Sequence, residues 1–187
     1  LRELMAARRQ LLGPDQVRDA AQRVAERFAA TPEFRERARL VLYAALPDEL
    51  PTRPLYEISR ASGKVLLWPR MAGRDRLEFA PCPRWEDLSR ERYGVLAPPL
   101  EQESVGLGPE DLLLVPGVAF DLRGGRLGRG RGYFDRALGE MGEPGPLSLG
   151  VGFEFQLVEK VPREPHDRAV AAVLTEHRLQ RVGERVR

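Results

Sequence analysis

Cysteine is almost absent from this chain of 187 residues, in which Cys82 is the only one. An intrachain disulfide and a metal site built on a CxxC motif are therefore excluded. Long apolar runs are missing too, since none approaches the roughly 20 residues that span a bilayer. The N-terminal residues form an arginine-bearing amphipathic pattern, which is unlike a signal peptide. We expect a soluble, cytoplasmic protein without a membrane partner, and we expect it to be a monomer.

Lysine is equally scarce, because only Lys64 and Lys160 among the 30 cationic residues are lysine. Such arginine usage reflects genome composition or thermal adaptation more often than function. The net charge of +2 does not by itself indicate a nucleic-acid partner. The 18 glycines and 16 prolines predict many turns between short elements, and the length fits one domain over residues 1–187.

Short apolar segments alternate with helix-like segments along the chain. We expect strands at residues 40–45, 65–68, 77–79, 112–115, 147–153 and 170–174. We expect helices at residues 2–29, 54–62 and 135–140, the first broken at Gly13-Pro14 and capped again by Asp15. Residues 82–108 are rich in proline and predict loop and edge structure. This order is typical of an α/β fold with an open, mainly parallel sheet flanked by helices, in which ligands bind beyond the carboxyl ends of the strands.

The most informative segment is residues 114–138, LVPGVAFDLRGGRLGRGRGYFDRAL. A buried-looking strand runs into a loop of glycines and arginines at residues 123–132, here called the Gly-Arg loop. Glycines let backbone N–H groups turn toward an oxyanion, and guanidinium groups add positive charge and paired donors. The loop therefore suits a polyphosphate. The carboxylate of Asp135, just beyond it, is most simply interpreted as a ligand of the magnesium ion that accompanies phosphates, although Asp135 could instead cap or begin the following helix.

Two other corners follow predicted strands, at residues 47–49 (PDE) and 68–70 (WPR), so that both can converge with the Gly-Arg loop on one cleft. Glu49 could be a ligand or an ordinary surface acid, and Trp68 is slightly better explained by packing than by stacking on a ligand. Of Tyr133 and Phe134, we expect one to pack inward and one to face the ligand. We expect His166 to be structural and His177 to face solvent.

Four ordered blocks of sequence carry a resemblance to a known family. They are residues 115–121 (VPGVAFD) with 126–136 (RLGRGRGYFDR), residues 43–49 (YAALPDE) with 52–54, residues 67–70 (LWPR), and residues 150–153 (GVGF) with 156–157, 161–162 and 166–167. In these blocks the chain closely resembles the 5-formyltetrahydrofolate cyclo-ligase family, also called 5,10-methenyltetrahydrofolate synthetases. The resemblance implies a sheet similar to the sugar-phosphate isomerase and CoA-transferase folds.

The resemblance also implies a reaction. A ligase of one-carbon folate metabolism would use ATP and Mg²⁺ to convert 5-formyltetrahydrofolate to 5,10-methenyltetrahydrofolate, releasing ADP and phosphate. The formyl oxygen would be phosphorylated, and N10 would then attack the activated carbon. Because phosphoryl transfer needs mainly positioning and charge neutralisation, no nucleophilic serine or cysteine is required.

Site residues follow by match to the family's motifs. The ATP site would comprise Arg2, Arg126, Leu127, Gly128, Arg129, Gly130, Arg131, Gly132, Tyr133 and Phe134. The folate site would comprise Ala44, Glu49, Arg129, Gly130, Arg131, Gly132 and Tyr133. Arg129, Arg131 and Tyr133 would be catalytic, and Asp135 and Asp167 would bind Mg²⁺. A further aspartate of the family is replaced here by Ala171, so Asp167 alone is taken from that segment.

Two other functions remain open from the residues alone. Arginine-glycine segments bind RNA by charge and stacking, but those are usually disordered and repeated, whereas this one is single and bounded by apolar elements. We therefore expect small-molecule substrates and no nucleic-acid partner. A different enzyme on a similar sheet, such as a sugar-phosphate isomerase or a CoA transferase, is the other alternative. Glu49 discriminates, because a CoA-transferase glutamate would form a trappable thioester.

Overall fold

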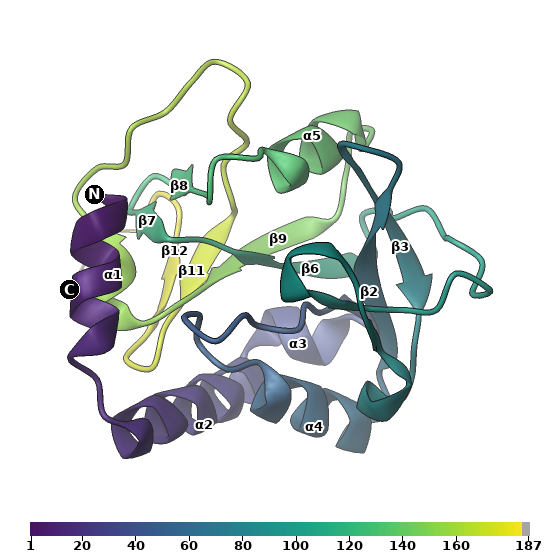
Figure 1. Ribbon diagram of the computed structural model, residues 1–187, viewed down its shortest axis with the longest axis horizontal. Coiled ribbons are helices and arrows are strands. Elements are labelled where there is room, and N and C mark those ends of the chain that lie inside the picture. The colour runs from purple at the N-terminus through teal and green to yellow at the C-terminus, as the bar shows by residue number, and fades with distance from the viewer. Residues whose placement is uncertain (185–187) are drawn as a thin grey trace.

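The computed structural model describes residues 1–184, and within them a seven-stranded sheet has the order β12-β11-β9-β6-β1-β2-β3 (Figure 1). Its strands are β1 (Arg39–Val41), β2 (Val65–Ala72), β3 (Arg76–Pro81), β6 (Asp111–Pro116), β9 (Leu147–Val151), β11 (Ala172–Leu174) and β12 (Leu179–Arg181). The five inner strands run parallel, while β3 and β12 pair antiparallel at the two edges. The predicted open, mainly parallel α/β sheet is confirmed.

Helices cover both faces of this sheet (Figure 1). On one face lie α2 (Pro14–Ala30), α3 (Pro32–Glu36) and α4 (Arg53–Ala61), and on the other lies α5 (Tyr133–Glu140). Beside the sheet stands α1 (Arg2–Gln10), next to a small sheet of β7 (Ala119–Asp121), β8 (Arg126–Leu127) and β10 (Leu157–Val158). The side chain of Met5 in α1 packs against Ala119, Leu127 and Val161. None of the helices in this part of the chain has the length and apolar character that crossing a membrane requires.

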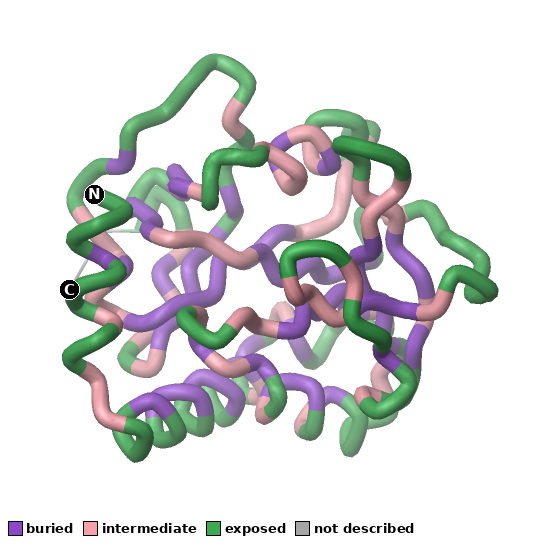
Figure 2. The backbone as a smooth tube through the Cα atoms, viewed as in Figure 1, coloured by how far each residue is buried: buried purple, intermediate pink, exposed green. Residues whose placement is uncertain are grey.

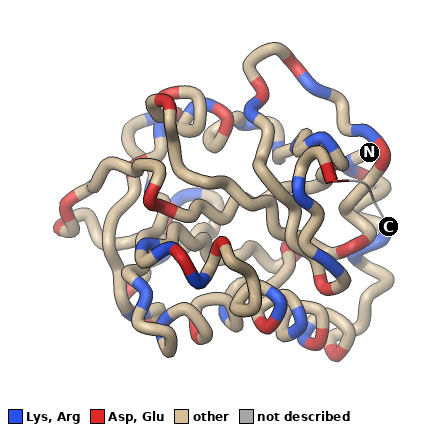
Figure 3. Tube along the Cα trace, turned by 180° about the vertical axis from the view of Figure 1, so that it is seen from behind, with Lys and Arg blue, Asp and Glu red and all other residues tan. Residues whose placement is uncertain are grey.

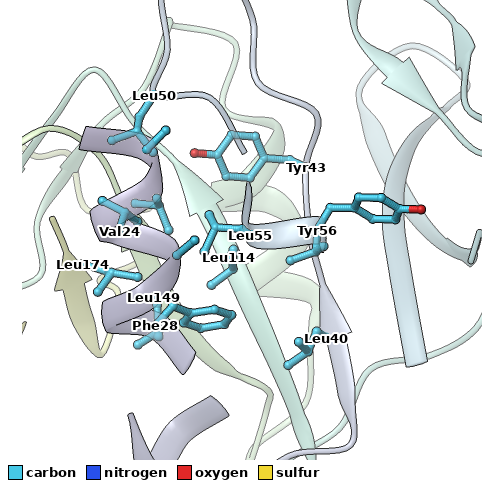
Figure 4. Close-up of a cluster of buried hydrophobic side chains, with 14 of the residues drawn as sticks. Val24, Phe28, Leu40, Tyr43, Leu50, Leu55, Tyr56, Leu114, Leu149 and Leu174 are labelled. Carbon is cyan, nitrogen blue, oxygen red and sulfur yellow. The ribbon is translucent and has the colours of Figure 1, made fainter. Parts of the chain in front are cut away.

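Successive strand residues point to opposite faces, which explains why the inner strands are almost wholly apolar. Leu112 and Leu114 pack into the cluster that contains α2 and α4, whereas Leu113 and Val115 pack into the cluster that contains Ala137 of α5. Figure 4 shows the first cluster between helix and strands, and Figure 2 shows the buried centre and the exposed loops. Charges of both signs are spread over the surface (Figure 3).

Several short elements depart from the predictions. Asp15 does not cap α2, because Pro14 already occupies its first turn and Gly13 is the N-cap; Asp15 instead pairs with Arg18 at 2.6 Å. The strand predicted at residues 40–45 ends at Val41. The chain leaves the sheet there because Thr52 Oγ1 accepts a hydrogen bond from the Ala45 N–H at 3.1 Å and donates one to the Tyr43 carbonyl at 2.5 Å.

The segment at residues 82–108 is largely loop, as predicted, but it contains a small hairpin of β4 (Ser89–Arg90) and β5 (Leu96–Ala97). Among residues 1–184 the chain also forms the 3₁₀ turns η1 (Trp85–Asp87) and η2 (Arg92–Gly94) and, outside this segment, η3 (Glu154–Gln156). Such short turns and the two-residue strands of the hairpin carry no readable period, so the sequence pattern does not predict them.

Candidate active site

A cleft of about 690 Å³ lies at the carboxyl edge of the parallel strands. The chain reaches it from α1, from the corner after β1, from β2, from the β4–β5 hairpin, from the Gly-Arg loop and from residues 162–167. The following residues predicted for the site all line it: Arg2, Ala44, Glu49, Arg126, Leu127, Gly128, Arg129, Gly130, Arg131, Gly132, Tyr133, Phe134, Asp135 and Asp167. Residues from the two ends of the chain thus meet in one cavity.

The Gly-Arg loop passes from β8 into α5 through a backbone that only glycine adopts without strain. Gly130 has φ +96° and Gly132, the N-cap of α5, has φ +65°. A side chain at either position would be held in the left-handed region at a cost of about 1–2 kcal/mol. These glycines therefore fix the path of the loop along the cleft wall.

Arg126 and Asp135 form an ion pair at the base of this loop. Arg126 Nη2 lies 2.7 Å from Asp135 Oδ2, and the two side chains are only 4% and 10% exposed. Asp135 Oδ1 also accepts a hydrogen bond from the Arg168 N–H at 3.2 Å. Within residues 1–184, the buried Nε and Nη2 atoms of Arg126 complete no hydrogen bond of good geometry. The guanidinium is therefore held by charge and keeps donors available for an anion.

Asp135 does not cap α5, since that position belongs to Gly132, and its carboxylate turns into the cleft. Asp167 lies at the same cleft and accepts a hydrogen bond from the Glu164 N–H at 2.7 Å. No cluster of three or more acidic, histidine or cysteine side chains suited to a metal occurs in the described part of the chain. Two carboxylates do suit a magnesium ion whose remaining ligands are phosphate oxygens and water.

Glu49 is linked to the Gly-Arg loop by Arg129. Arg129 Nε donates to Glu49 Oε1 at 3.2 Å, and its Nη2 donates to Asp48 Oδ1 at 2.6 Å. Burial raises the pKa of Glu49, and this outweighs the lowering by the Leu46 N–H and Arg129. Partial burial also acts to raise the pKa of Asp48, but the hydrogen bond and charge of Arg129 outweigh it and leave that pKa below its ordinary value. Sequence reasoning had missed Asp48 as a partner.

Arg2 contacts the Gly-Arg loop from α1, and Arg131 belongs to the loop itself. Arg2 Nε donates to the Gly128 carbonyl at 2.9 Å, which places the predicted N-terminal arginine at the cleft. The guanidinium of Arg131 lies 4.0 Å from the centre of the Tyr93 ring. Tyr93 is a cleft residue that the sequence did not single out, and its backbone has the unusual φ of +62°. Strained backbone of this kind concentrates at functional sites. The positive φ of Tyr93 marks it as a candidate site residue, and it is visible in the structure but not in the sequence.

The side chains of Arg70 and Glu91, which line the cleft together with Tyr93, make hydrogen bonds to backbone groups. Arg70 Nη1 donates to the carbonyls of Pro99 and Gln102 at 2.8 and 2.7 Å, and the Met71 N–H donates to Glu91 Oε2 at 3.2 Å. Arg70 is 7% exposed and lines the cleft. The corner predicted at residues 68–70 is wrong, because β2 continues to Ala72 and Arg70 is paired with Glu78 of β3 within the sheet.

The aromatic and histidine residues lie in different environments. His166, which we expected to be structural, lines the cleft with a side chain that is 69% exposed. Phe134 packs against the apolar cluster under α5, while the Tyr133 hydroxyl donates to the Arg74 carbonyl at 3.1 Å at the cleft rim. Trp68 is fully buried and its Nε1 donates to the Cys82 carbonyl, so its role is packing. The side chain of His177 is 62% exposed and faces solvent.

Comparison with known proteins shows which family the chain is similar to. The model of the "5-formyltetrahydrofolate cyclo-ligase family" matches residues 1–176. The 5-formyltetrahydrofolate cyclo-ligase of Escherichia coli strain K12 is 33% identical over 177 residues, which cover 92% of this chain and 96% of that protein. The mouse 5-formyltetrahydrofolate cyclo-ligase is 26% identical over 161 residues, covering 81% and 79% of the two chains.

Solved structures resemble the whole fold. The 5,10-methenyltetrahydrofolate synthetase of Aquifex aeolicus superposes with a TM-score of 0.82 at 30% identity, covering 100% of this chain and 93% of the other. The synthetase of Mycoplasma pneumoniae has a TM-score of 0.72 at 19% identity, with 94% and 96% coverage, and supports the fold alone. The chain belongs to the 5-formyltetrahydrofolate cyclo-ligase family.

Proposed function

We propose that this protein catalyses the ATP-dependent cyclisation of 5-formyltetrahydrofolate to 5,10-methenyltetrahydrofolate, with release of ADP and phosphate. The observation that carries the proposal is the position of Arg129. Its guanidinium contacts Glu49 on one side and belongs to the anion-binding Gly-Arg loop on the other. One cleft thus offers an acceptor for a heterocycle beside a cradle for phosphates.

The folate subsite is centred on Glu49, whose side chain is 15% exposed. A carboxylate pairs well with the adjacent amino and ring N–H groups of a pterin, because both oxygens can accept at once. The Leu46 N–H holds Oε2 at 2.9 Å and so fixes the orientation of the carboxylate. Tyr43 and Ala44 form the neighbouring wall, with the bulk of both residues buried.

The nucleotide subsite lies along residues 126–134 and Arg2. Arg126 offers buried donors, and Arg129 and Arg131 add positive charge along the loop. Preorganised donors of this kind stabilise the charge that develops during phosphoryl transfer. Arg129 and Arg131 would therefore be catalytic in the sense of neutralising charge. Tyr133, whose hydroxyl already has a backbone partner, would form part of the wall.

The chemistry then balances in two steps. The formyl oxygen attacks the terminal phosphorus of ATP, and the bond to ADP breaks. The N10 lone pair attacks the activated formyl carbon, the carbon–oxygen bond breaks, and phosphate leaves as N10 loses its proton. Asp135 and Asp167 would hold a magnesium ion together with phosphate oxygens, and the ion would supply charge neutralisation. The cleft residues hold the two substrates in line and in contact.

A direct assay tests the proposal. Protein mixed with ATP, Mg²⁺ and 5-formyltetrahydrofolate should produce the ultraviolet absorbance of the methenyl product. Absence of that absorbance, or equal product formation without ATP, would contradict the proposal. A covalent thioester on Glu49 after incubation with an acyl-CoA would instead support CoA transfer.

The metal assignment has its own test. Asp135→Asn should raise the Mg²⁺ concentration needed for half-maximal rate, by about tenfold if one ligand is lost. Glu140→Gln is the matched control, because Glu140 is an exposed acid on the same helix α5 and does not line the cleft. Circular dichroism checks that both variants fold. Equal Mg²⁺ dependence of the two variants would remove Asp135 from the metal site.

A further inference from the structure

Arg129 stands on a backbone that does little to fix its side chain. Glycines precede and follow it, at Gly128 and Gly130, and Arg129 is exposed. An arginine side chain loses about 2 kcal/mol of rotamer entropy when it is immobilised. A side chain in this setting needs partners if it is to stay in one place.

Among residues 1–184, the side chains that pair with Arg129 are those of Asp48 and Glu49. The two contacts use different atoms of the guanidinium. Nε donates to Glu49 at 3.2 Å, whereas Nη2 donates to Asp48 at the shorter distance of 2.6 Å. The contact with Asp48 is thus the shorter of the two, whereas the contact with Glu49 is the less exposed, since the side chains of Asp48 and Glu49 are 61% and 15% exposed.

The two contacts of Arg129 also differ in whether a bound substrate would compete for them. A pterin on Glu49 would compete with Arg129 Nε for Oε1, because it also donates to that carboxylate. It would not compete for Asp48, which does not line the cleft and whose side chain is 61% exposed. The pairing with Asp48 can persist while Glu49 changes partner.

We propose that Asp48 is a positioning residue, which holds the Arg129 guanidinium at the boundary between the folate and nucleotide subsites when substrate takes over Glu49. The inference deepens the proposed function and rests on it. Asp48 itself touches no substrate. It acts through Arg129, since without it the guanidinium swings out of the wall that the two substrates share.

The test is Asp48→Asn in the full chain, compared with wild type. The KM for 5-formyltetrahydrofolate should rise and kcat should fall, each by about three- to tenfold, as expected for a misplaced charged group. Asp48→Glu should recover part of the loss because its carboxylate can still reach the guanidinium. Asp15→Asn is the matched control, since Asp15 makes an exposed 2.6 Å ion pair with Arg18 away from the cleft.

The pH dependence of folate binding provides a readout that a merely structural role would not move. The groups that face Glu49 are Arg129, Asp48 and Tyr43. If Asp48 holds Arg129 in place, Asp48→Asn frees that cation and the pKa of Glu49 rises, so the acid limb of binding moves to higher pH. If Asp48 acts only through its own negative charge, its removal lowers the pKa of Glu49 and the limb moves to lower pH.

An acid limb displaced to higher pH, with partial rescue by Asp48→Glu, supports the inference. A displacement to lower pH, or kinetics like those of Asp15→Asn, overturns it. The outcome is separate from that of the proposed function. A wild-type protein that makes no methenyl product refutes the proposed function. An active wild type together with an Asp48→Asn variant whose kinetic constants are unchanged refutes this inference alone.

Discussion

Arg126 and Asp135 face each other across the start of α5 as an ion pair almost closed to solvent, with Nη2 and Oδ2 2.7 Å apart. The pair joins β8 to α5 and so spans residues 128–132, the part of the Gly-Arg loop that links them. The same two side chains would serve catalysis, one toward phosphate and one toward Mg²⁺.

Removing one member of this pair should be costly for stability. Arg126→Ala leaves the Asp135 carboxylate buried without its cation, and the free energy of unfolding should fall by about 3–5 kcal/mol. Arg18→Ala breaks the exposed pair with Asp15 and should cost no more than about 1 kcal/mol. Urea denaturation measures both. Similar losses in the two variants would show that the Arg126 pair is not effectively buried.

Substitutions at Gly132 and at Gly63 should have similar effects on stability but different effects on activity. Gly132→Ala and Gly63→Ala should each lose about 1–2 kcal/mol, because their φ values are +65° and +69°. A Cβ at Gly132 would also lie 3.1 Å from Nη1 of Arg136. That guanidinium cannot move freely, because its Nε and Nη2 atoms donate hydrogen bonds to the carbonyls of Asp75 and Arg131. Gly132→Ala should therefore lower kcat as well, while Gly63→Ala, with open space around it, should not. Equal kcat values would argue against a preorganised loop.

The N-terminal helix should matter for one substrate only. Arg2→Ala removes the donor to the Gly128 carbonyl, and the KM for ATP should rise by about three- to tenfold with the folate KM unchanged. Arg8→Ala is the control, because Arg8 bonds the Phe155 carbonyl and does not line the cleft. Steady-state kinetics with each substrate varied in turn decides this. A change in the KM for folate alone would contradict the assignment of Arg2 to the nucleotide subsite.

Glu49 should impose a cost on stability that grows with pH. Its folded-state pKa lies above its ordinary value of 4.5, chiefly because of burial, so its contribution to stability is fully present below pH 4.5 and is lost as pH rises through the folded pKa. Glu49→Gln cannot ionise, and its stability relative to wild type should improve from acid to neutral pH. Urea titrations over this range measure the trend.

Glu154 provides the opposite case. Burial acts to raise its pKa, but the Thr175 hydroxyl and Arg178 outweigh burial and lower it. Its contribution to stability is present above pH 4.5 and is lost as pH falls through the folded pKa. Glu154→Gln should therefore lose stability relative to wild type at neutral pH and converge with it in acid. Parallel curves for the two variants would contradict the assigned environments.

The parts of the site that could be predicted from the sequence are those that depend on interactions between residues close together in the chain. The glycine spacing at Gly130 and Gly132 predicted the loop because left-handed backbone is a local requirement. The cleft could be located because parallel strands bring their carboxyl ends together. Asp48 and Arg129 lie 81 residues apart in sequence, so their pairing depends on the packed fold. The hydrogen bonds from Arg70 to the carbonyls of Pro99 and Gln102 likewise join residues that are 29 and 32 positions apart, so they also depend on the packed fold.

In the fold, too, local sequence patterns predict some features, whereas others depend on contacts between distant residues. Leu112 to Val115 predicted an inner strand because four buried apolar residues in a row are typical of a sheet covered on both faces. The end of β1 at Val41 was not readable, because it depends on Thr52 capturing the Ala45 N–H. The apolar pattern of residues 42–45 records burial, and burial continues after the sheet pairing stops.

The measurement closest to the central claim is the kinetics of Arg129→Ala with both substrates varied. If Arg129 is the wall shared by folate and nucleotide, the variant should show a raised KM for 5-formyltetrahydrofolate, a raised KM for ATP and a kcat lowered by about tenfold or more. Wild-type values for all three constants, in a variant that folds normally, would contradict the claim that one guanidinium serves both subsites.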